Sequence, residues 1–217
     1  RGLGDVYKRQ RLHECLTEFL AHKEEVEACF RYCVEAYSSN FGTIEAALTS
    51  GKCRSKNPFC HLSAERAGCT YWGKFADTAA QFGIAQLLKN WVVLDKEEMS
   101  VSHLSRYLTL ITFAGGAYIA NFTLQRKEEL GSLRTSCLSW DEDEELGRVA
   151  IICGETTKTD PDSDARWVAS PSVATAVNAA SVVAHLRMEC DRFNPTLRPT
   201  AEDQEDPYLL SVSSEPW

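Results

Sequence analysis

An uncharged run in the middle of the sequence constrains the fold more than any other feature. From Tyr107 to Leu124 the chain carries no acidic or basic residue. A helix that is apolar on all sides lies either in a membrane or at the centre of a folded domain. No aromatic belt or basic flank frames this run, and several polar or small residues dilute it: Thr109, Thr112, Gly115, Gly116, Asn121 and Thr123. The sequence therefore predicts the central helix of a soluble domain and no membrane contact.

Charge returns abruptly where the apolar run ends. Arg126, Lys127, Glu128 and Glu129 follow within five residues of Leu124. A buried helix that ends in four charged residues requires either a solvated surface or a polar site at that end. The pattern alone favours the surface, with Glu129 simply paired to a nearby arginine.

Other segments carry weaker secondary-structure signals. Apolar residues recur every three or four positions from residue 11 to residue 37, which predicts one amphipathic helix whose stripe lapses at Lys23. A short helix is expected around residues 44–48 and a longer helical segment at about 70–93. The predicted core of the latter is Phe75, Ala79, Phe82, Leu87, Leu88 and Trp91.

The C-terminal part has a different pattern. Residues 148–153 and 166–170 are short β-rich runs, and DEDEELG before them is expected to be a polar turn. Ser170 as N-cap and Pro171 at the first helical position predict another helix, with a core face of Val173, Ala176, Val177, Ala180, Val183 and Ala184. The proline-rich acidic tail from residue 191 is expected to be irregular. The fold class is therefore mainly α with a small β-hairpin or sheet (α+β).

Charge and cysteine content limit the possible functions. The net charge of −8 argues against a protein that coats nucleic acid indiscriminately, although it leaves room for a local basic site. The nine cysteines include no C-x-x-C, and Cys29 and Cys33 share a helix face. We expect reduced thiols in a cytoplasmic protein and no metal site. A Cys/His metal protein is the competing possibility, and it predicts stoichiometric zinc.

Both ends indicate a clipped sequence. DVYKRQ, residues 5–10, resembles the translation of a transposon end used to prepare sequencing libraries. Residues 1–10 are therefore expected to be a sequencing artefact. The chain also stops at SSEPW without a closing element, so we expect a fragment of a longer gene.

The stretch TLQRKEELGSLRTSCLSW, residues 123–140, resembles the first catalytic box of the tyrosine recombinases, the phage-integrase family of mobile elements. That box commonly reads T-G-L-R-x-x-E-L-x-x-L-R-W-x-D-I. Seven residues fall on it without a gap: Thr123, Arg126, Glu129, Leu130, Leu133, Arg134 and Leu138. The family continues with two strands whose T-K-T turn carries an active-site lysine, and this chain continues with RVAIICGETTKT, which contains Lys158.

The resemblance implies a DNA strand-breaking and rejoining reaction through a 3′-phosphotyrosine link, with no metal or nucleotide cofactor. Arg126 is expected to stabilise the charge on the phosphate oxygens, because a guanidinium makes paired, charge-assisted bonds to them. Glu129 is expected to orient Arg126 from the same helix face. Lys158 is expected to protonate the leaving oxygen, although by itself it also fits a solvated turn. Arg134 is carried over as a DNA-contacting residue.

The resemblance also implies a partial integrase-like catalytic core that acts on double-stranded DNA as a homo-oligomer in the full-length parent. Residues 11–58 are expected to be a helical remnant of a core-binding domain, and residues 59–217 the N-terminal half of the catalytic domain. The loop with Lys52, Arg54 and Lys56 is the predicted phosphate-contacting patch. A solvated linker fits the same loop equally well.

The chain departs from the family in its first box, in its hairpin turn, which has one extra residue (GETTKT), and in its second box. Leu124 and Gln125 stand where the box has Gly and Leu, and Cys137 stands where it often has Asp. The second box, H-x-x-R, and the tyrosine nucleophile do not occur at matching positions, because His185 is followed by Leu-Arg-Met and Tyr208 lacks a preceding box. We therefore expect this fragment to be inactive by itself. The alternative is a catalytically dead relative, or a helical module that binds DNA or protein.

Overall fold

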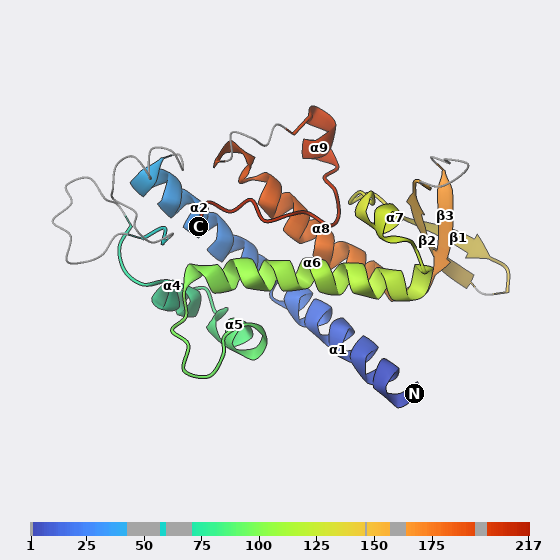
Figure 1. The fold of residues 1–217 in the computed structure, drawn as a ribbon, viewed down its shortest axis with the longest axis horizontal. Coiled ribbons are helices and arrows are strands. Elements are labelled where there is room, and N and C mark those ends of the chain that lie inside the picture. Colours follow the sequence, from blue (N-terminus) through green and yellow to red (C-terminus); the bar gives the residue numbers. More distant parts are fainter. Residues whose placement is uncertain (1, 43–56, 60–70, 146, 157–163, 194–198) are drawn as a thin grey trace. The chain divides into compact units, whose positions relative to one another are not determined.

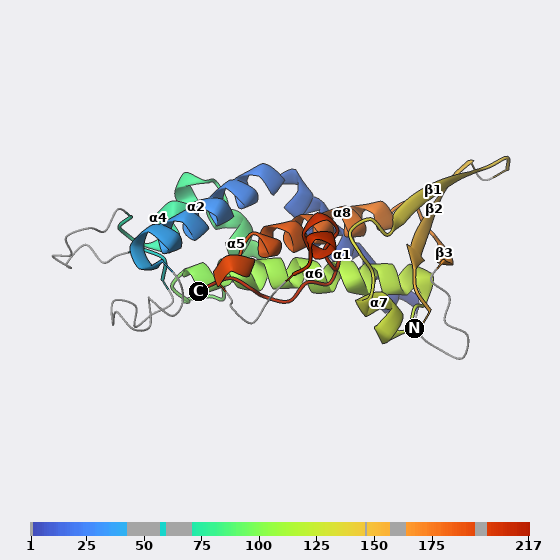
Figure 2. The same ribbon diagram turned by 90° about the horizontal axis from the view of Figure 1, so that it is seen from above.

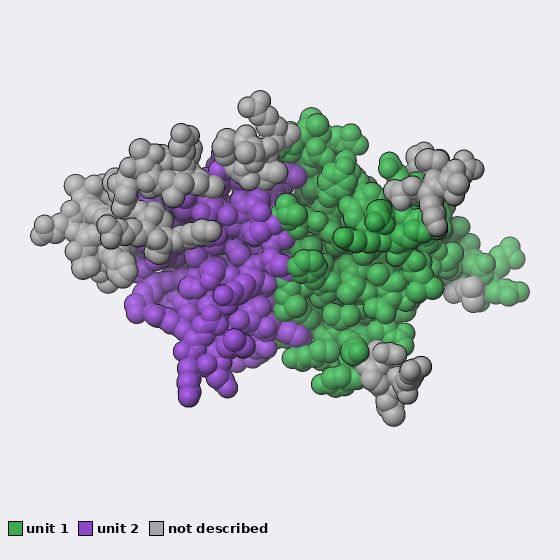
Figure 3. Space-filling view, viewed as in Figure 1, with its two compact units in different colours: residues 1–21, 110–185, 199–212 green, residues 22–109, 186–198, 213–217 purple. Residues whose placement is uncertain are grey.

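The computed structural model describes residues 2–42, 57–59, 71–145, 147–156, 164–193 and 199–217 (Figure 1). These residues form a mainly helical protein with one three-stranded antiparallel sheet. The chain divides into two compact units (Figure 3). The sheet unit comprises Arg1–Ala21, Leu110–His185 and Pro199–Val212, and the helical unit comprises His22–Thr109, Leu186–Arg198 and Ser213–Trp217.

The sheet unit carries the end of the apolar helix and everything that directly follows it. Helix α6, Val101–Thr123, enters this unit at Leu110 and is followed by the short helix α7, Lys127–Gly131. Strands β1 (Leu138–Asp143), β2 (Gly147–Gly154) and β3 (Ala165–Ala169) form the sheet in that order. Helix α1 (Gly2–Ala21), most of helix α8 (Val173–Met188) and helix α9 (Ala201–Glu205) complete the unit.

Helices α6 and α8 pack closely within the sheet unit, and they run side by side in both views (Figures 1 and 2). A Cβ atom on Gly115 of α6 would lie 3.2 Å from the backbone oxygen of Ala176 and 3.2 Å from the Cβ of Ala180. The glycine therefore permits this approach. The predicted core face of α8 is confirmed, since Val173, Ala176, Val177, Ala180, Val183 and Ala184 are all buried.

The helical unit is built from one long helix, several short helices and the first part of α6. Its elements are α2 (Lys23–Phe41), α4 (Phe75–Gln81), α5 (Ala85–Trp91) and the 3-10 helix Asp191–Phe193. The segment Ser213–Trp217 is anchored in it, because the indole N–H of Trp217 donates to the Ser105 hydroxyl at 2.8 Å. Glu215 forms a buried ion pair with Arg187 at 3.1 Å.

Two predicted helices are interrupted. The single helix expected from residue 11 to residue 37 is wrong, because α1 ends at Ala21 and α2 begins at Lys23. His22 between them has φ −113° and ψ 22°, and the apolar stripe lapses at the next residue. The segment at about 70–93 is likewise divided into α4 and α5, and Gly83 between them adopts φ +76°.

Two further predictions in the C-terminal part are wrong in part. The polar turn expected over residues 141–147 is shorter than predicted, because Asp141–Asp143 belong to strand β1, whose acidic end is exposed, and the turn is at Glu144 and Glu145. The tail is not wholly irregular, because α9 forms in its acidic run, with the Thr200 hydroxyl accepting a hydrogen bond from the N–H of Asp203. Strands β2 and β3 match the two predicted β-rich runs within one residue at each end.

The expectations for residues 44–48 and for the basic loop with Lys52, Arg54 and Lys56 fall outside the described residues. Within the described ranges, no helix combines the length and the apolar character needed to cross a membrane.

Candidate functional site

The end of α6 determines how the chain leaves the core. The N–H of Leu124 donates to the carbonyl of Ala120 at 2.9 Å, and Leu124 adopts φ +54°. This geometry is the left-handed C-terminal stop of a helix, a position usually occupied by Gly. Two residues later, Arg126 is extended, with φ −71° and ψ 160°, and forms the N-cap of α7.

Arg126 and Glu129 form a pair at the start of α7. One carboxylate oxygen of Glu129 accepts the backbone N–H of Arg126 at 2.8 Å, and the other accepts a guanidinium N–H of Arg126 at 3.2 Å. The Glu129 side chain is only 7% exposed, whereas the Arg126 side chain is 51% exposed. The buried carboxylate therefore restrains the arginine while about half of the arginine side chain faces solvent.

The expected contact between Glu129 and Arg126 forms, but not on a shared helix face, because Arg126 is the extended residue that precedes α7. The carboxylate satisfies one of the orphan N–H groups at the helix start, as in a capping box. Among the described residues, Glu129 is the only ion-pair partner of Arg126. A guanidinium that is paired on one edge and exposed on the other can donate to an anion such as a phosphate without first breaking its ion pair.

Arg134 lies in a different environment. Its guanidinium donates to the Asp203 carboxylate at 2.7 Å and to the backbone oxygen of Asp206 at 2.9 Å. It also stacks on the Tyr208 ring, 3.8 Å from the centroid. The DNA contact expected of Arg134 remains a prediction, and it would compete with Asp203 for the same guanidinium.

Asp203 and Asp206, which we call the acidic clamp, hold the loop after α7. Asp206 accepts hydrogen bonds from the Thr135 hydroxyl at 2.7 Å and from the Ser136 N–H at 2.9 Å. Backbone hydrogen bonds extend the contact: Thr135 N–H to the Pro207 oxygen at 3.0 Å, and Leu209 N–H to the Leu133 oxygen at 2.7 Å.

The clamp carboxylates are held in their charged form. The Arg134 guanidinium, followed by hydrogen bonds from Thr200, lowers the pKa of Asp203 to about 2. Burial would raise the pKa of Asp206, but hydrogen bonds from Ser136 and Thr135 outweigh it and lower this pKa below its usual value. Sequence reasoning missed the clamp, although the T-x-x-D spacing of Thr200 and Asp203 is a recognisable helix-start signal.

Four of the predicted site residues, Lys158, Lys52, Arg54 and Lys56, lie outside the described residues. Tyr208 is 47% exposed and takes part in the clamp contact through its ring. The described ranges contain no cluster of three or more His, Cys, Asp or Glu side chains that could hold a metal ion.

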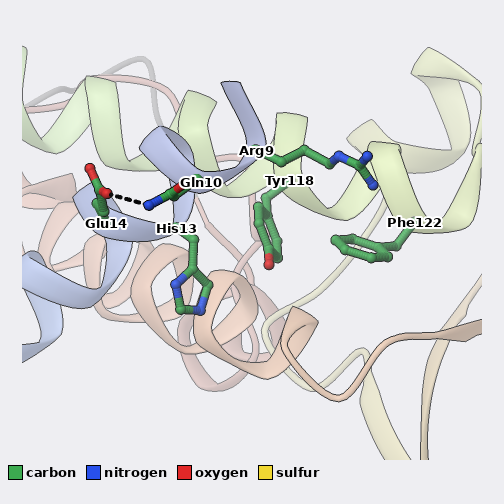
Figure 4. A pocket seen from close by; sticks show the side chains of 6 residues that line it. All are labelled: Arg9, Gln10, His13, Glu14, Tyr118 and Phe122. Atoms are coloured by element: carbon green, nitrogen blue, oxygen red, sulfur yellow. Dashed lines mark hydrogen bonds between the residues drawn. The ribbon is translucent and has the colours of Figure 1, made fainter. Parts of the chain in front are cut away.

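A hollow of about 570 Å³ lies in the sheet unit between α1 and α6 (Figure 4). Tyr118 and Phe122 line it from α6, with ring centroids 5.1 Å apart. Its other lining residues come from α1: Arg9, Gln10, His13 and Glu14.

Comparisons with protein-family models, with curated proteins and with solved structures found no match.

Proposed function

We propose that this chain is part of a DNA strand-breaking and rejoining enzyme of the tyrosine recombinase type. The observation that carries the proposal is the arginine at the end of the buried helix. Arg126 is half exposed and is tied at 3.2 Å to the buried carboxylate of Glu129. This arrangement suits the binding of a backbone phosphate, since the guanidinium is fixed before the phosphate arrives.

The order of the elements supports the same proposal. The apolar helix α6, the Arg126–Glu129 pair and α7 are followed by the antiparallel strands β1, β2 and β3 and then by α8. This is the order in which the resemblance expects the arginine box, the hairpin and the following helix. The left-handed residue Leu124, φ +54°, also occupies the position where the box has Gly.

The proposed role of Arg126 is to bind the non-bridging oxygens of the phosphate as negative charge builds on them. The proposed role of Glu129 is to hold Arg126 in the geometry needed for paired hydrogen bonds. Lys158 is proposed as the acid that protonates the departing oxygen. The second arginine, the histidine and the tyrosine of the reaction are not encoded in these residues, so the proposal for this chain alone is DNA-phosphate binding without cleavage.

Substitution of Glu129 tests the proposal, because the proposal and the change in net charge predict opposite effects on DNA binding. Replacing Glu129 with Gln removes one negative charge, which by itself strengthens binding to DNA. If Glu129 positions Arg126, Glu129→Gln should instead weaken binding to a labelled random-sequence duplex, measured by fluorescence anisotropy over a salt series. Exposed Glu128 is the matched control, and Glu128→Gln should strengthen binding slightly.

Arg126 itself is tested in the same assay. Arg126→Ala should reduce the slope of log K against log salt by about 1, the value for one lost phosphate contact. Lys127→Ala removes the same charge from the next residue, which is also exposed, and should have a smaller effect. Equal effects of the two substitutions, or stronger binding by Glu129→Gln, would contradict the proposal.

The sequence of the source gene distinguishes the proposed enzyme from the alternative, a catalytically dead relative or a binding module. Sequencing past the Trp217 codon should reveal an H-x-x-R box followed by a tyrosine within one further half-domain of about 100 codons. A stop codon soon after Trp217 would favour the binding module.

A further inference from the structure

Cys137 and Cys153 lie opposite each other at the start of the sheet. In the β1–β2 pairing, Ser139 is opposite Ile151 and Leu138 is opposite Ile152. One residue further in this register, Cys137 is opposite Cys153, and the N–H of Cys153 donates to the carbonyl of Cys137 at 2.7 Å. One hydrogen bond therefore continues the pairing to the two cysteines, while the N–H of Cys137 donates to the carbonyl of Arg134 at 3.1 Å.

The two sulfur atoms lie on the same face of the sheet. Directly opposed residues of an antiparallel pair project their side chains to the same side. The Ser139 hydroxyl lies 3.4 Å from the Cys153 sulfur. Ser139 is two residues from Cys137, so the two side chains project from the same face. The contact between Ser139 and the Cys153 sulfur therefore places that sulfur on the face of Cys137, in agreement with the register.

The spacing suits a disulfide. Directly opposed residues of an antiparallel pair have Cα atoms about 4.5–5.5 Å apart, within the range of about 4.4–6.8 Å found for disulfides. Their Cβ atoms are about 4.5–5.5 Å apart and must approach to about 3.8 Å, so the bond stores some strain and is more easily reduced. We propose that Cys137 and Cys153 form a reversible redox site that closes as a cross-strand disulfide.

The two thiols have different roles in this closure. Cys153 is partly exposed, whereas Cys137 is 3% exposed. Burial raises the pKa of the Cys137 thiol to about 12, which leaves it unreactive as the first nucleophile. Cys153 is therefore the thiol that an external oxidant meets, and Cys137 is the thiol that resolves the adduct.

Glutathione disulfide is the oxidant class that fits this sequence of steps. The Cys153 thiolate attacks one glutathione sulfur, the S–S bond of glutathione breaks, and one glutathione thiol leaves. Cys137 then loses its proton and its sulfur attacks the Cys153 sulfur, which releases the second glutathione. Two protein thiols are oxidised to one disulfide, and one glutathione disulfide is reduced to two thiols.

Trypsin makes the product directly readable. Cleavage after Arg134, Arg148 and Lys158 places Cys137 in the peptide 135–148 and Cys153 in the peptide 149–158, each with a single cysteine. The folded chain is incubated with glutathione disulfide, the remaining thiols are alkylated, and the digest is analysed by mass spectrometry. We expect a linked 135–148/149–158 species that dithiothreitol converts back to the two free peptides.

Cys29 and Cys33 provide a control that separates proximity of two cysteines from access of the oxidant. Cys29 and Cys33 lie one turn apart on α2 but are both fully buried. Their peptides, 24–31 and 32–52, should remain unlinked under the same conditions, because the oxidant does not reach them. Cys53, Cys60 and Cys69 fall outside the described residues, so the peptide-resolved measurement is used instead of the total mass.

Single substitutions separate the two roles. Cys137→Ser should leave a stable glutathione adduct on Cys153, and Cys153→Ser should leave Cys137 free for alkylation after unfolding. Unlinked 135–148 and 149–158 peptides in the wild-type digest, with Cys153 either alkylated or carrying glutathione, would overturn the proposal. The test does not depend on DNA binding, so its outcome is independent of the proposed function.

Discussion

Replacing Leu124 with Gly is expected to stabilise the chain, because Leu124 is held in a conformation that disfavours it. The residue has φ +54° and closes α6 through its N–H bond to Ala120 at 2.9 Å. An L-residue with a side chain pays about 1–2 kcal/mol to adopt the left-handed region, and Gly pays essentially nothing. The same position carries Gly in the recombinase box that this stretch resembles.

The opposing contributions are small at this site. Leu124 is 85% exposed, so its removal forfeits about 0.2–0.5 kcal/mol of the about 1.5–3 kcal/mol that full burial of a leucine contributes. Gly also gives the unfolded chain more freedom, which costs about 0.4–1 kcal/mol. The sum predicts that Leu124→Gly raises the free energy of unfolding by about 0.5 kcal/mol.

Leu124→Ala is the matched control, because it removes the same side chain but retains the strained conformation. We expect Ala to lower the free energy of unfolding by about 0.3 kcal/mol, so the two variants should differ by about 0.8 kcal/mol, or about 2–3 °C in Tm for a chain of this length. Urea denaturation followed by tryptophan fluorescence measures the difference. If Ala is as stable as Gly, Leu124 does not carry backbone strain and the argument for this helix stop fails.

Three other predictions use the ion pairs. Glu215, whose side chain is 0% exposed, pairs with Arg187, so Glu215→Gln should lower the free energy of unfolding by about 3–5 kcal/mol. The control is Glu189→Gln at the surface pair with Arg31, which should lower it by less than about 1 kcal/mol. Equal urea midpoints for the two variants would contradict this prediction. Since the pKa of Asp203 falls from 3.8 to about 2 on folding, the charged Asp203 carboxylate stabilises the folded chain above pH 4, and this contribution is lost as the pH falls toward 2. Tm measured against pH should show this loss in the wild type but not in Asp203→Asn. The same substitution frees Arg134, so it should tighten binding to duplex DNA more than Glu202→Gln does, and equal effects would exclude Arg134 from the interface.

The parts of the fold that depend on local periodicity could be predicted from the sequence. The apolar run from Tyr107 to Leu124 lies within α6 except for its last residue, and α8 buries the predicted face. The interruptions were harder to predict, because they depend on single residues. His22 ends the pattern between α1 and α2 without a glycine or proline to mark the break. At Gly83 the signal was present, since a glycine inside a helical pattern is a recognised breaker.

The candidate site shows the same division between local and distant information. Glu129 and Arg126 are three residues apart, so their contact could be expected from local spacing, although it forms at the start of α7 as a capping contact and not on the shared helix face that the sequence predicts. Arg134 and Asp203 are 69 residues apart, and no pattern around Arg134 indicates which acid will reach it. A sequence motif identifies an arginine that is available for an anion, but only the folded chain shows whether a carboxylate has already taken that place. At Arg126 the partner is buried and leaves half of the side chain open, whereas at Arg134 Asp203, Asp206 and Tyr208 surround the guanidinium. Of the two arginines that the motif marks, Arg126 is therefore the one whose guanidinium is open to an anion without a prior rearrangement, and under the proposed function Arg134 would reach a phosphate only after the acidic clamp moves.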